Sequence, residues 1–135
     1  MSTFRAIKAL ARQGRAFHTT ARRNDHFLNA NAETLQKAVS NKDKVVLVDF
    51  YADWCNPCKM LSPVLEKLTA DSSIKTGSGK PLDLVTVDTD AEVALAQQFN
   101  IRSLPTVIAF KDGEPISQFM GAMPEPSVRN FINTL

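Results

Sequence analysis

The residues from Val45 to Ala52 place the strongest constraint on the fold. They are rich in β-branched and other apolar residues at both odd and even positions, whereas a strand with one face in water alternates apolar and polar residues. Lysine-rich and polar segments bound this run. The pattern therefore predicts a strand buried on both faces, in the middle of a sheet that other elements cover.

The remaining sequence predicts an α/β domain. From Asp25 onward, β-rich apolar runs alternate with helix-like segments, which indicates a parallel or mixed sheet covered on its faces. Besides the central strand, the expected strands are 26–29, 82–89, 106–110 and 115–119, the last two forming an antiparallel hairpin. The expected helices are 31–40 with Asn31 as its N-cap, 57–71 with Pro63 inside it, 90–100 and 124–135. Residues 72–81 are expected to form a surface loop.

Charge is divided unevenly along the 135 residues, which are enough for one domain with a real core. Residues 1–24 hold six of the 16 basic residues and none of the 14 acidic ones, so residues 25–135 hold ten basic and 14 acidic residues, a net charge of −4. An acidic domain gives no electrostatic reason to expect nucleic-acid binding. No segment reaches the roughly 18 apolar residues of a membrane span, so we expect no membrane insertion.

Residues 1–24 have the composition of a mitochondrial presequence, because they are Arg-rich and acid-free and their apolar residues recur at roughly helical spacing. A secretory signal would need a continuous apolar stretch of about 7 to 15 residues. The sequence around Arg15 resembles the two-step processing pattern of matrix proteins, with cuts after Ala16 and Asn24. We therefore expect residues 25–135 to be the mature domain in the mitochondrial matrix; the alternative is a basic tail without a targeting function.

The two cysteines of the chain, Cys55 and Cys58, follow the predicted central strand and lie at the start of a predicted helix. Unpaired N–H groups at a helix N-terminus favour a thiolate over a thiol, and Lys59 adds a positive charge. The spacing lets the two sulfurs close a short ring, so Cys55 is expected to attack a substrate disulfide and Cys58 to displace the reduced product. Asn56 and Pro57 shape the turn and are expected to tune the reduction potential.

Two other uses of this cysteine pair stay open. A structural zinc site needs four ligands, but the chain has no second cysteine pair, and its two histidines are His18 in the leader and His26. We therefore expect no metal. An inert pair of buried thiols is the second alternative, and the position between a strand and a helix argues against it.

Asp49 is a carboxylic acid within the apolar central strand. Burial would raise its pKa, and a buried carboxylate behind the dithiol is suited to accept the proton of Cys58 as that thiol attacks. A hydrogen-bonded core residue without a catalytic role is the alternative. Trp54 is expected to pack beside the site.

Pro105 stands at the entry to a predicted strand. The usual frequencies of the two isomers favour a trans bond at this position. A cis bond would bring the backbone of Leu104 against the dithiol loop, leaving polar groups for an extended substrate peptide.

Together these motifs closely resemble the thioredoxin family. The matching residues are 48–60 (VDFYADWCNPCKM), Pro63, 101–106 (IRSLPT), 110–114 (FKDGE) and Gly121. The likeness spans essentially all of residues 25–135. Together with the leader, it makes the chain resemble the mitochondrial members of the family. The resemblance implies a thioredoxin-like fold, with a central mixed sheet of about five strands flanked by four helices.

The resemblance also implies a role for each matching residue. Cys55 takes the position of the nucleophile, Cys58 that of the resolving thiol, and Asp49 that of the acid that deprotonates Cys58. Pro105 takes the family's cis-proline position, against the usual isomer frequencies. The expected substrate contacts are Trp54, Pro57, Leu104, Pro105 and Gly121.

The implied activity is that of a monomeric protein-disulfide reductase with no bound cofactor. NADPH and FAD would belong to thioredoxin reductase, which recharges the dithiol, and the substrates would be disulfide-containing mitochondrial proteins such as peroxiredoxins. A disulfide oxidase or isomerase is one alternative, which a reduction potential near about −120 to −180 mV would support. A redox-inactive binding or structural subunit with a thioredoxin fold is another.

Two departures from the family pattern bear on the chemistry. The usual spacer is Gly-Pro, so the side chain of Asn56 is expected to alter the loop and its potential. A lysine often faces the buried acid from the strand at 84–88, whereas the matching residue here is Thr86. Without that cation, Asp49 is expected to stay protonated to a higher pH.

Overall fold

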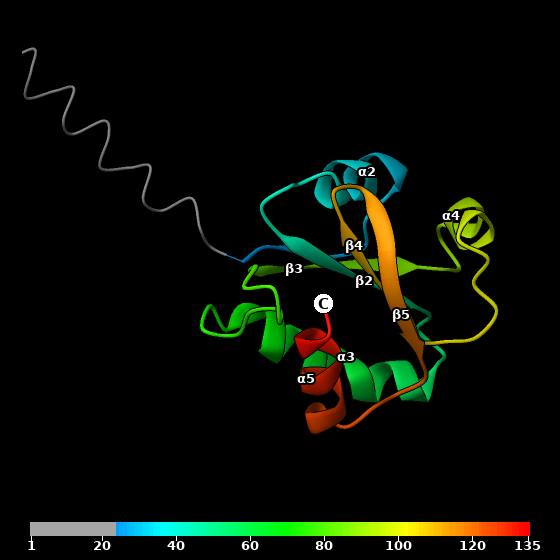
Figure 1. Ribbon diagram of the computed structural model, residues 1–135. Coiled ribbons are helices and arrows are strands. Elements are labelled where there is room, and N and C mark those ends of the chain that lie inside the picture. Colours follow the sequence, from blue (N-terminus) through cyan, green and yellow to red (C-terminus); the bar gives the residue numbers. More distant parts are fainter. Residues whose placement is uncertain (1–23) are drawn as a thin grey trace, which may run out of the picture.

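The computed structural model of the chain describes residues 24–135, which form the layered domain of Figure 1. Residues 1–23 of the predicted presequence, with the predicted first cut after Ala16, lie outside the described residues. Asn24 is the one leader residue that the structure describes. No helix within residues 24–135 is long and apolar enough to cross a membrane.

The helices and strands follow the predicted order. The strands are β1 (His26–Phe27), β2 (Val45–Tyr51), β3 (Leu82–Asp88), β4 (Thr106–Lys111) and β5 (Glu114–Met120). The helices are α2 (Ala32–Val39), α3 (Asn56–Ala70), α4 (Val93–Gln98) and α5 (Glu125–Asn133). The predicted thioredoxin-like arrangement, a mixed five-stranded sheet with four helices, is confirmed.

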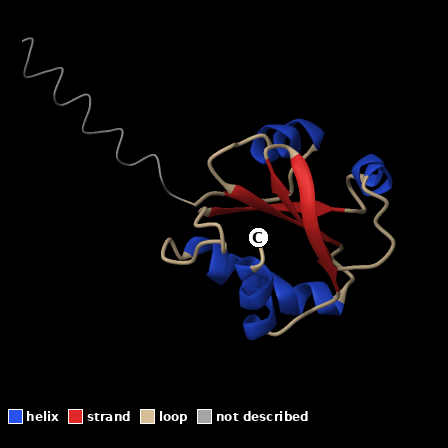
Figure 2. Ribbon diagram, viewed as in Figure 1, coloured by secondary structure: helices blue, strands red, loops and turns tan. Residues whose placement is uncertain are grey.

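The sheet has the order β1-β3-β2-β4-β5, with β2 in its middle. Figure 2 shows its strands in red between the helices in blue. β1 and β2 run parallel to β3, whereas β4 is antiparallel to both β2 and β5. Parallel strands need crossover connections: α2 joins β1 to β2, and α3 joins β2 to its neighbour β3. The predicted central position of the apolar run is therefore confirmed.

The sheet separates two apolar cores. Figure 1 shows the helices that cover them, α2 and α4 on one side of the sheet and α3 and α5 on the other. Val46, Val48 and Phe50 of β2 pack with α2 and α4 on one face. Val45 and Leu47 pack with α3 and α5 on the other. Because successive strand residues point to opposite faces, Asp49 shares the face of α3, the helix that begins at the cysteines.

The ends of two helices show how side chains set their bounds. Asn31 caps α2 as predicted, since its Oδ1 accepts the N–H of Thr34 at 2.9 Å. The prediction of a helix over 90–100 was too long, because α4 begins only at Val93. Asp88 accepts the N–H of Asp90 with its side chain and that of Glu92 with its carbonyl oxygen. These bonds hold 89–92 in a turn and delay the helix.

The predicted hairpin joins β4 and β5 through two residues. Lys111 pairs with Glu114, and Asp112 and Gly113 between them both have positive φ, at 54° and 80°. Positive φ at both central positions is the condition for the tight turn that matches the twist of a hairpin, and Asp-Gly meets it at little cost.

The loop 72–81 is anchored on the end of α5. The N–H of Gly77 donates to the carbonyl oxygen of Ile132 at 3.3 Å, and that of Ser78 donates to Leu135 at 3.0 Å. Ile132 lies in the last turn of α5 and Leu135 just beyond it, where carbonyl groups have no i+4 partner within the helix, so the loop adds a donor to each. A side chain at Gly77 would collide with the carbonyl oxygen of Asn133.

We therefore expect Gly77→Ala to destabilise the protein by about 1–3 kcal/mol, because the added methyl group forces the loop away from α5. Urea denaturation would measure the loss. Ser72→Ala, an exposed change in the same loop, is the control and should stay within about 0.5 kcal/mol of the parent. Equal stability of the two variants would contradict the tight contact.

Candidate active site

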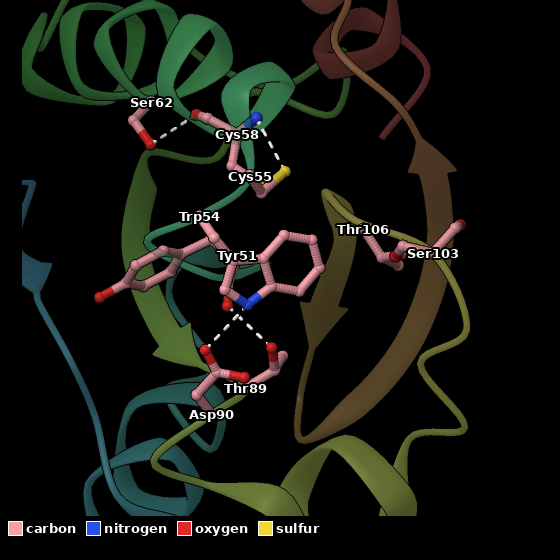
Figure 3. Close-up of a disulfide and its surroundings, with 9 residues drawn as sticks. All are labelled: Tyr51, Trp54, Cys55, Cys58, Ser62, Thr89, Asp90, Ser103 and Thr106. Atoms are coloured by element: carbon pink, nitrogen blue, oxygen red, sulfur yellow. Dashed lines mark hydrogen bonds between the residues drawn. A yellow bond between two sulfur atoms is a disulfide. The ribbon is translucent and has the colours of Figure 1, made fainter.

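The cysteines lie at the start of α3, shortly after the end of β2 (Figure 3). The N–H of Cys55 donates to the carbonyl oxygen of Ala52 at 3.1 Å, which closes a turn after the strand. Cys55 is then the N-cap of α3, and its sulfur accepts the N–H of Cys58 at 3.2 Å. The two cysteines form a disulfide with their Cα atoms 5.3 Å apart, so the predicted ring is closed.

This position prepares the sulfur of Cys55 for nucleophilic attack. Once the disulfide is reduced, the same helix N-terminus presents an N–H donor and the positive end of the dipole to that sulfur, which favours its thiolate. Cys55 is 4% exposed and Cys58 1% exposed, and of the two only Cys55 lines the adjoining hollow, from which a substrate sulfur would reach it. Asn56, Pro57 and Lys59 lie exposed in the first turn of α3.

A hollow of about 530 Å³ adjoins the disulfide. Its lining is mostly apolar and consists of Trp54, Cys55, Asn56, Pro57, Thr89, Ala96, Ile101, Arg102, Ser103 and Leu104. Trp54 is 70% exposed and donates its Nε1–H to Oδ2 of Asp90 at 3.0 Å (Figure 3). The indole is therefore a fixed apolar wall beside the sulfur rather than part of the core.

The loop before β4 forms another part of the site. The peptide bond between Leu104 and Pro105 is cis, as the resemblance implied, so the trans expectation from isomer frequencies was wrong. Leu104 packs against the cysteine cluster and lines the hollow, whereas Pro105 itself is buried. Gly121, at a φ of 86°, donates its N–H to the carbonyl oxygen of Pro105 at 2.8 Å.

Known proteins share both the sequence and this arrangement. The family model described as Thioredoxin matches residues 26–134. The chain belongs to the thioredoxin family. It is 36% identical over 106 residues to a thioredoxin of Haemophilus influenzae, which covers 78% of this chain and 94% of the relative.

Solved thioredoxin structures superpose on the same domain. A mutant thioredoxin from Halobacterium salinarum is 33% identical, with a TM-score of 0.70, over 83% of this chain and 91% of the other. Mitochondrial thioredoxin 3 from Saccharomyces cerevisiae, in its oxidized form, is 28% identical, with a TM-score of 0.67. That match covers 81% of this chain and 94% of the yeast protein.

The family and the disulfide together show that this chain is a thiol-disulfide oxidoreductase that reduces protein disulfides. Thioredoxins act through their own dithiol and require no cofactor. Within residues 24–135 there is no group of three or more His, Cys, Asp and Glu side chains that could hold a metal ion. The family's general partners are thioredoxin reductase and disulfide-containing proteins.

Asp49 is buried on the α3 face of β2, and its Oδ1 has no hydrogen-bond partner among residues 24–135. Burial, and secondly the charge of Glu66, raises the pKa of Asp49 from 3.8 to about 7. Thr86 lies opposite it in β3, but the Thr86 hydroxyl accepts the N–H of Asn29 at 2.8 Å. Thr86 brings no cation to Asp49, and the carboxyl group is poised to exchange a proton near neutral pH.

The sequence predictions missed two side chains beside the disulfide. Asp90, which accepts the hydrogen bond of Trp54, was predicted to lie inside a helix. The signal that could have found it is strand direction: Trp54 and Asp90 follow the neighbouring parallel strands β2 and β3, whose carboxyl ends lie at the same edge of the sheet. Tyr51 packs on the cysteine cluster and donates its hydroxyl to Oδ1 of Asn29. Burial first, then the carboxylate of Asp88, raises the pKa of Tyr51, so this hydroxyl remains a neutral donor.

The raised pKa of Asp49 predicts a pH-dependent stability of the oxidised protein. The contribution of protonated Asp49 to the free energy of unfolding is fully present below pH 3.8 and is lost as the pH rises through about 7. Asp49→Asn should match the parent at pH 4 and exceed its stability by about 4 kcal/mol at pH 8. Denaturation across pH would measure this difference. The exposed Asp53→Asn should show no such difference, and parallel curves for parent and Asp49→Asn would contradict the buried acid.

Proposed function

We propose that this chain is a thioredoxin of the mitochondrial matrix, recharged by thioredoxin reductase and reducing disulfide proteins such as peroxiredoxins. The observation that carries the reductase activity is the Cys55–Cys58 disulfide at the N-terminus of α3, beside a mostly apolar hollow. The Arg-rich, acid-free leader supports the location, and one structural relative is a mitochondrial thioredoxin of yeast. The protein acts as a monomer.

The cycle proceeds by two exchanges between sulfur atoms. The Cys55 thiolate attacks one sulfur of the substrate disulfide, forming a mixed disulfide and releasing the other substrate sulfur as a thiolate. Cys58 then loses its proton to Asp49 and attacks Cys55, which releases the second substrate sulfur and restores the Cys55–Cys58 disulfide. The substrate gains two electrons and the protein loses two.

Asp49 suits this second step because it has no hydrogen-bond donor to hold its charge at Oδ1 among residues 24–135. Its pKa of about 7 lets the carboxylate accept a proton at the pH of the matrix without being so basic that it retains it. Its place on the α3 face of β2 directs it toward the helix that carries Cys58.

The hollow gives the substrate a place to dock. Trp54 and Ile101 offer apolar surface, and the cis bond before Pro105 sets the Leu104 backbone beside the cysteine cluster. An extended peptide whose own cysteine is bonded to Cys55 would lie along this backbone with an apolar side chain in the hollow.

The reductase cycle is tested by NADPH consumption when the protein, thioredoxin reductase and a protein disulfide are mixed. We expect turnover by the parent and at least a roughly thousandfold loss in Cys55→Ser, because the remaining Cys58 is only 1% exposed and has no second thiol to resolve a mixed disulfide. Cys58→Ser is the matched control, since it should stall as a mixed disulfide visible on a non-reducing gel. Turnover that survives in Cys55→Ser would contradict Cys55 as the nucleophile, and an inactive parent would favour a redox-inactive binding subunit instead.

The location is tested by fusing residues 1–24 to a fluorescent reporter. We expect import into mitochondria and an amino terminus that shows removal of the leader after Asn24. A matched fusion in which the six basic leader residues are replaced by glutamine should stay in the cytosol, because import depends on their charge. A parent fusion that also stays cytosolic would rule out the targeting function.

A further inference from the structure

A buried cluster of charges lies at the start of the domain, away from the disulfide loop. Asp83 of β3 is only 2% exposed, and its Oδ1 accepts Nζ of Lys44 at 2.9 Å. The same oxygen accepts the backbone N–H of Asp25 at 2.7 Å. The Asp25 side chain lies 3.5 Å from Lys44 through its Oδ2.

The backbone holds the nitrogen of Asp25 in this position. The carbonyl oxygen of Asp25 accepts the N–H of Leu84 at 2.9 Å, and the next residue, His26, pairs with Leu84 in the parallel ladder of β1 and β3. The nitrogen that faces Asp83 is therefore fixed from one side by the sheet itself. It is also the nitrogen that would become the α-amino group if the chain were cut after Asn24.

The side chain of Asn24 makes only part of its possible hydrogen bonds. Its side-chain NH₂ group donates to the carbonyl oxygen of Thr69 at 2.6 Å, but its Oδ1 is buried without a hydrogen-bond partner among residues 24–135. Removal of Asn24 thus gives up one hydrogen bond and relieves one buried, unsatisfied acceptor.

Cleavage after Asn24 would also balance the charges. In the uncut chain, Lys44 faces two carboxylates, those of Asp25 and Asp83. A free ammonium group on Asp25 would make two cations and two carboxylates, and would turn a neutral N–H donor into a charged one, which forms the stronger bond. A hollow of about 210 Å³ beside Asp25 and Asp83 leaves room for the additional N–H bonds; Lys37 on its rim is the other charge that faces it.

We propose that Asp83, paired with Lys44, is a binding site for the free α-amino group of a chain that begins at Asp25. Cleavage after Asn24 creates an ion pair that anchors the new amino terminus to β3. The inference rests on the proposed removal of the leader, but its chemistry can be tested separately from import and from reductase activity.

The test compares the chain beginning at Asp25 with a free amine and the same chain acetylated at that amine. Acetylation retains an N–H donor and removes the charge. The thioredoxin family model matches residues 26–134, so this chain keeps the whole of the matched domain. At pH 6.5 we expect the free amine to be more stable toward urea, by about threefold to thirtyfold in the unfolding equilibrium constant. Above about pH 8 this advantage should decline as the ammonium loses its proton.

Asp83→Asn should abolish the difference between the free and acetylated chains, because the carboxylate that binds the ammonium is gone. Asp112→Asn is the matched control: it is exposed, its positive φ suits asparagine, and it should keep the full difference. Equal stability of the free and acetylated parent, or the same difference in Asp83→Asn, would overturn the proposal. If Asp83→Asn does not fold, the parent pair compared at pH 6.5 and pH 10 remains decisive.

The uncut chain of 135 residues completes the test. It has no ammonium at Asp25, so its stability should not show the decline above pH 8 that the chain beginning at Asp25 shows. NADPH assays on the same samples separate the two proposals, since acetylation should leave the reductase rate unchanged. Loss of import or of turnover would contradict the proposed function, whereas the stability difference between the free and acetylated chains tests the binding of the amine by Asp83 on its own.

Discussion

Hydrogen bonding along both edges of β2 is the interaction on which the rest of the structure depends. The strand pairs with β3 from Val45 to Tyr51 and with β4 from Val45 to Phe50. Two ladders fix its register, and a shift of one residue would turn every side chain to the other face. The same register that buries the apolar side chains in two cores thus directs Asp49 to the face of α3 and delivers Cys55 to the start of that helix.

The site assembles at one edge of the sheet because of strand direction. β2 and β3 are parallel, so the residues that follow them, Trp54 and Asp90, meet and join by a hydrogen bond. β4 is antiparallel to β2, so its entry, at Pro105, reaches the same edge from the opposite chain direction. Three segments distant in sequence thereby enclose the disulfide, and each is held by a strand rather than by a flexible loop.

Two buried carboxyl groups in this sheet have opposite surroundings. Asp83 receives a lysine and a backbone N–H, which offset the cost of burying its charge. No such donor is found for Oδ1 of Asp49 among residues 24–135. Thr86 lies opposite it, but the Thr86 hydroxyl accepts the N–H of Asn29. The first arrangement gives a buried carboxylate two donors, whereas the second leaves a carboxyl group whose pKa of about 7 suits proton transfer.

The sequence by itself determined the elements and the reactive pair. Apolar runs, the Asn31 cap, the Asp112-Gly113 turn and the Cys55–Cys58 spacing are local patterns, and local sterics and hydrogen bonding decide them. Tertiary structure alone decided the contacts between segments: the hydrogen bond from Trp54 to Asp90, the lack of a partner for Oδ1 of Asp49, and the hydrogen bond from the Asp25 N–H to Asp83. These depend on strand order and register, which bring distant residues together and which no local pattern contains.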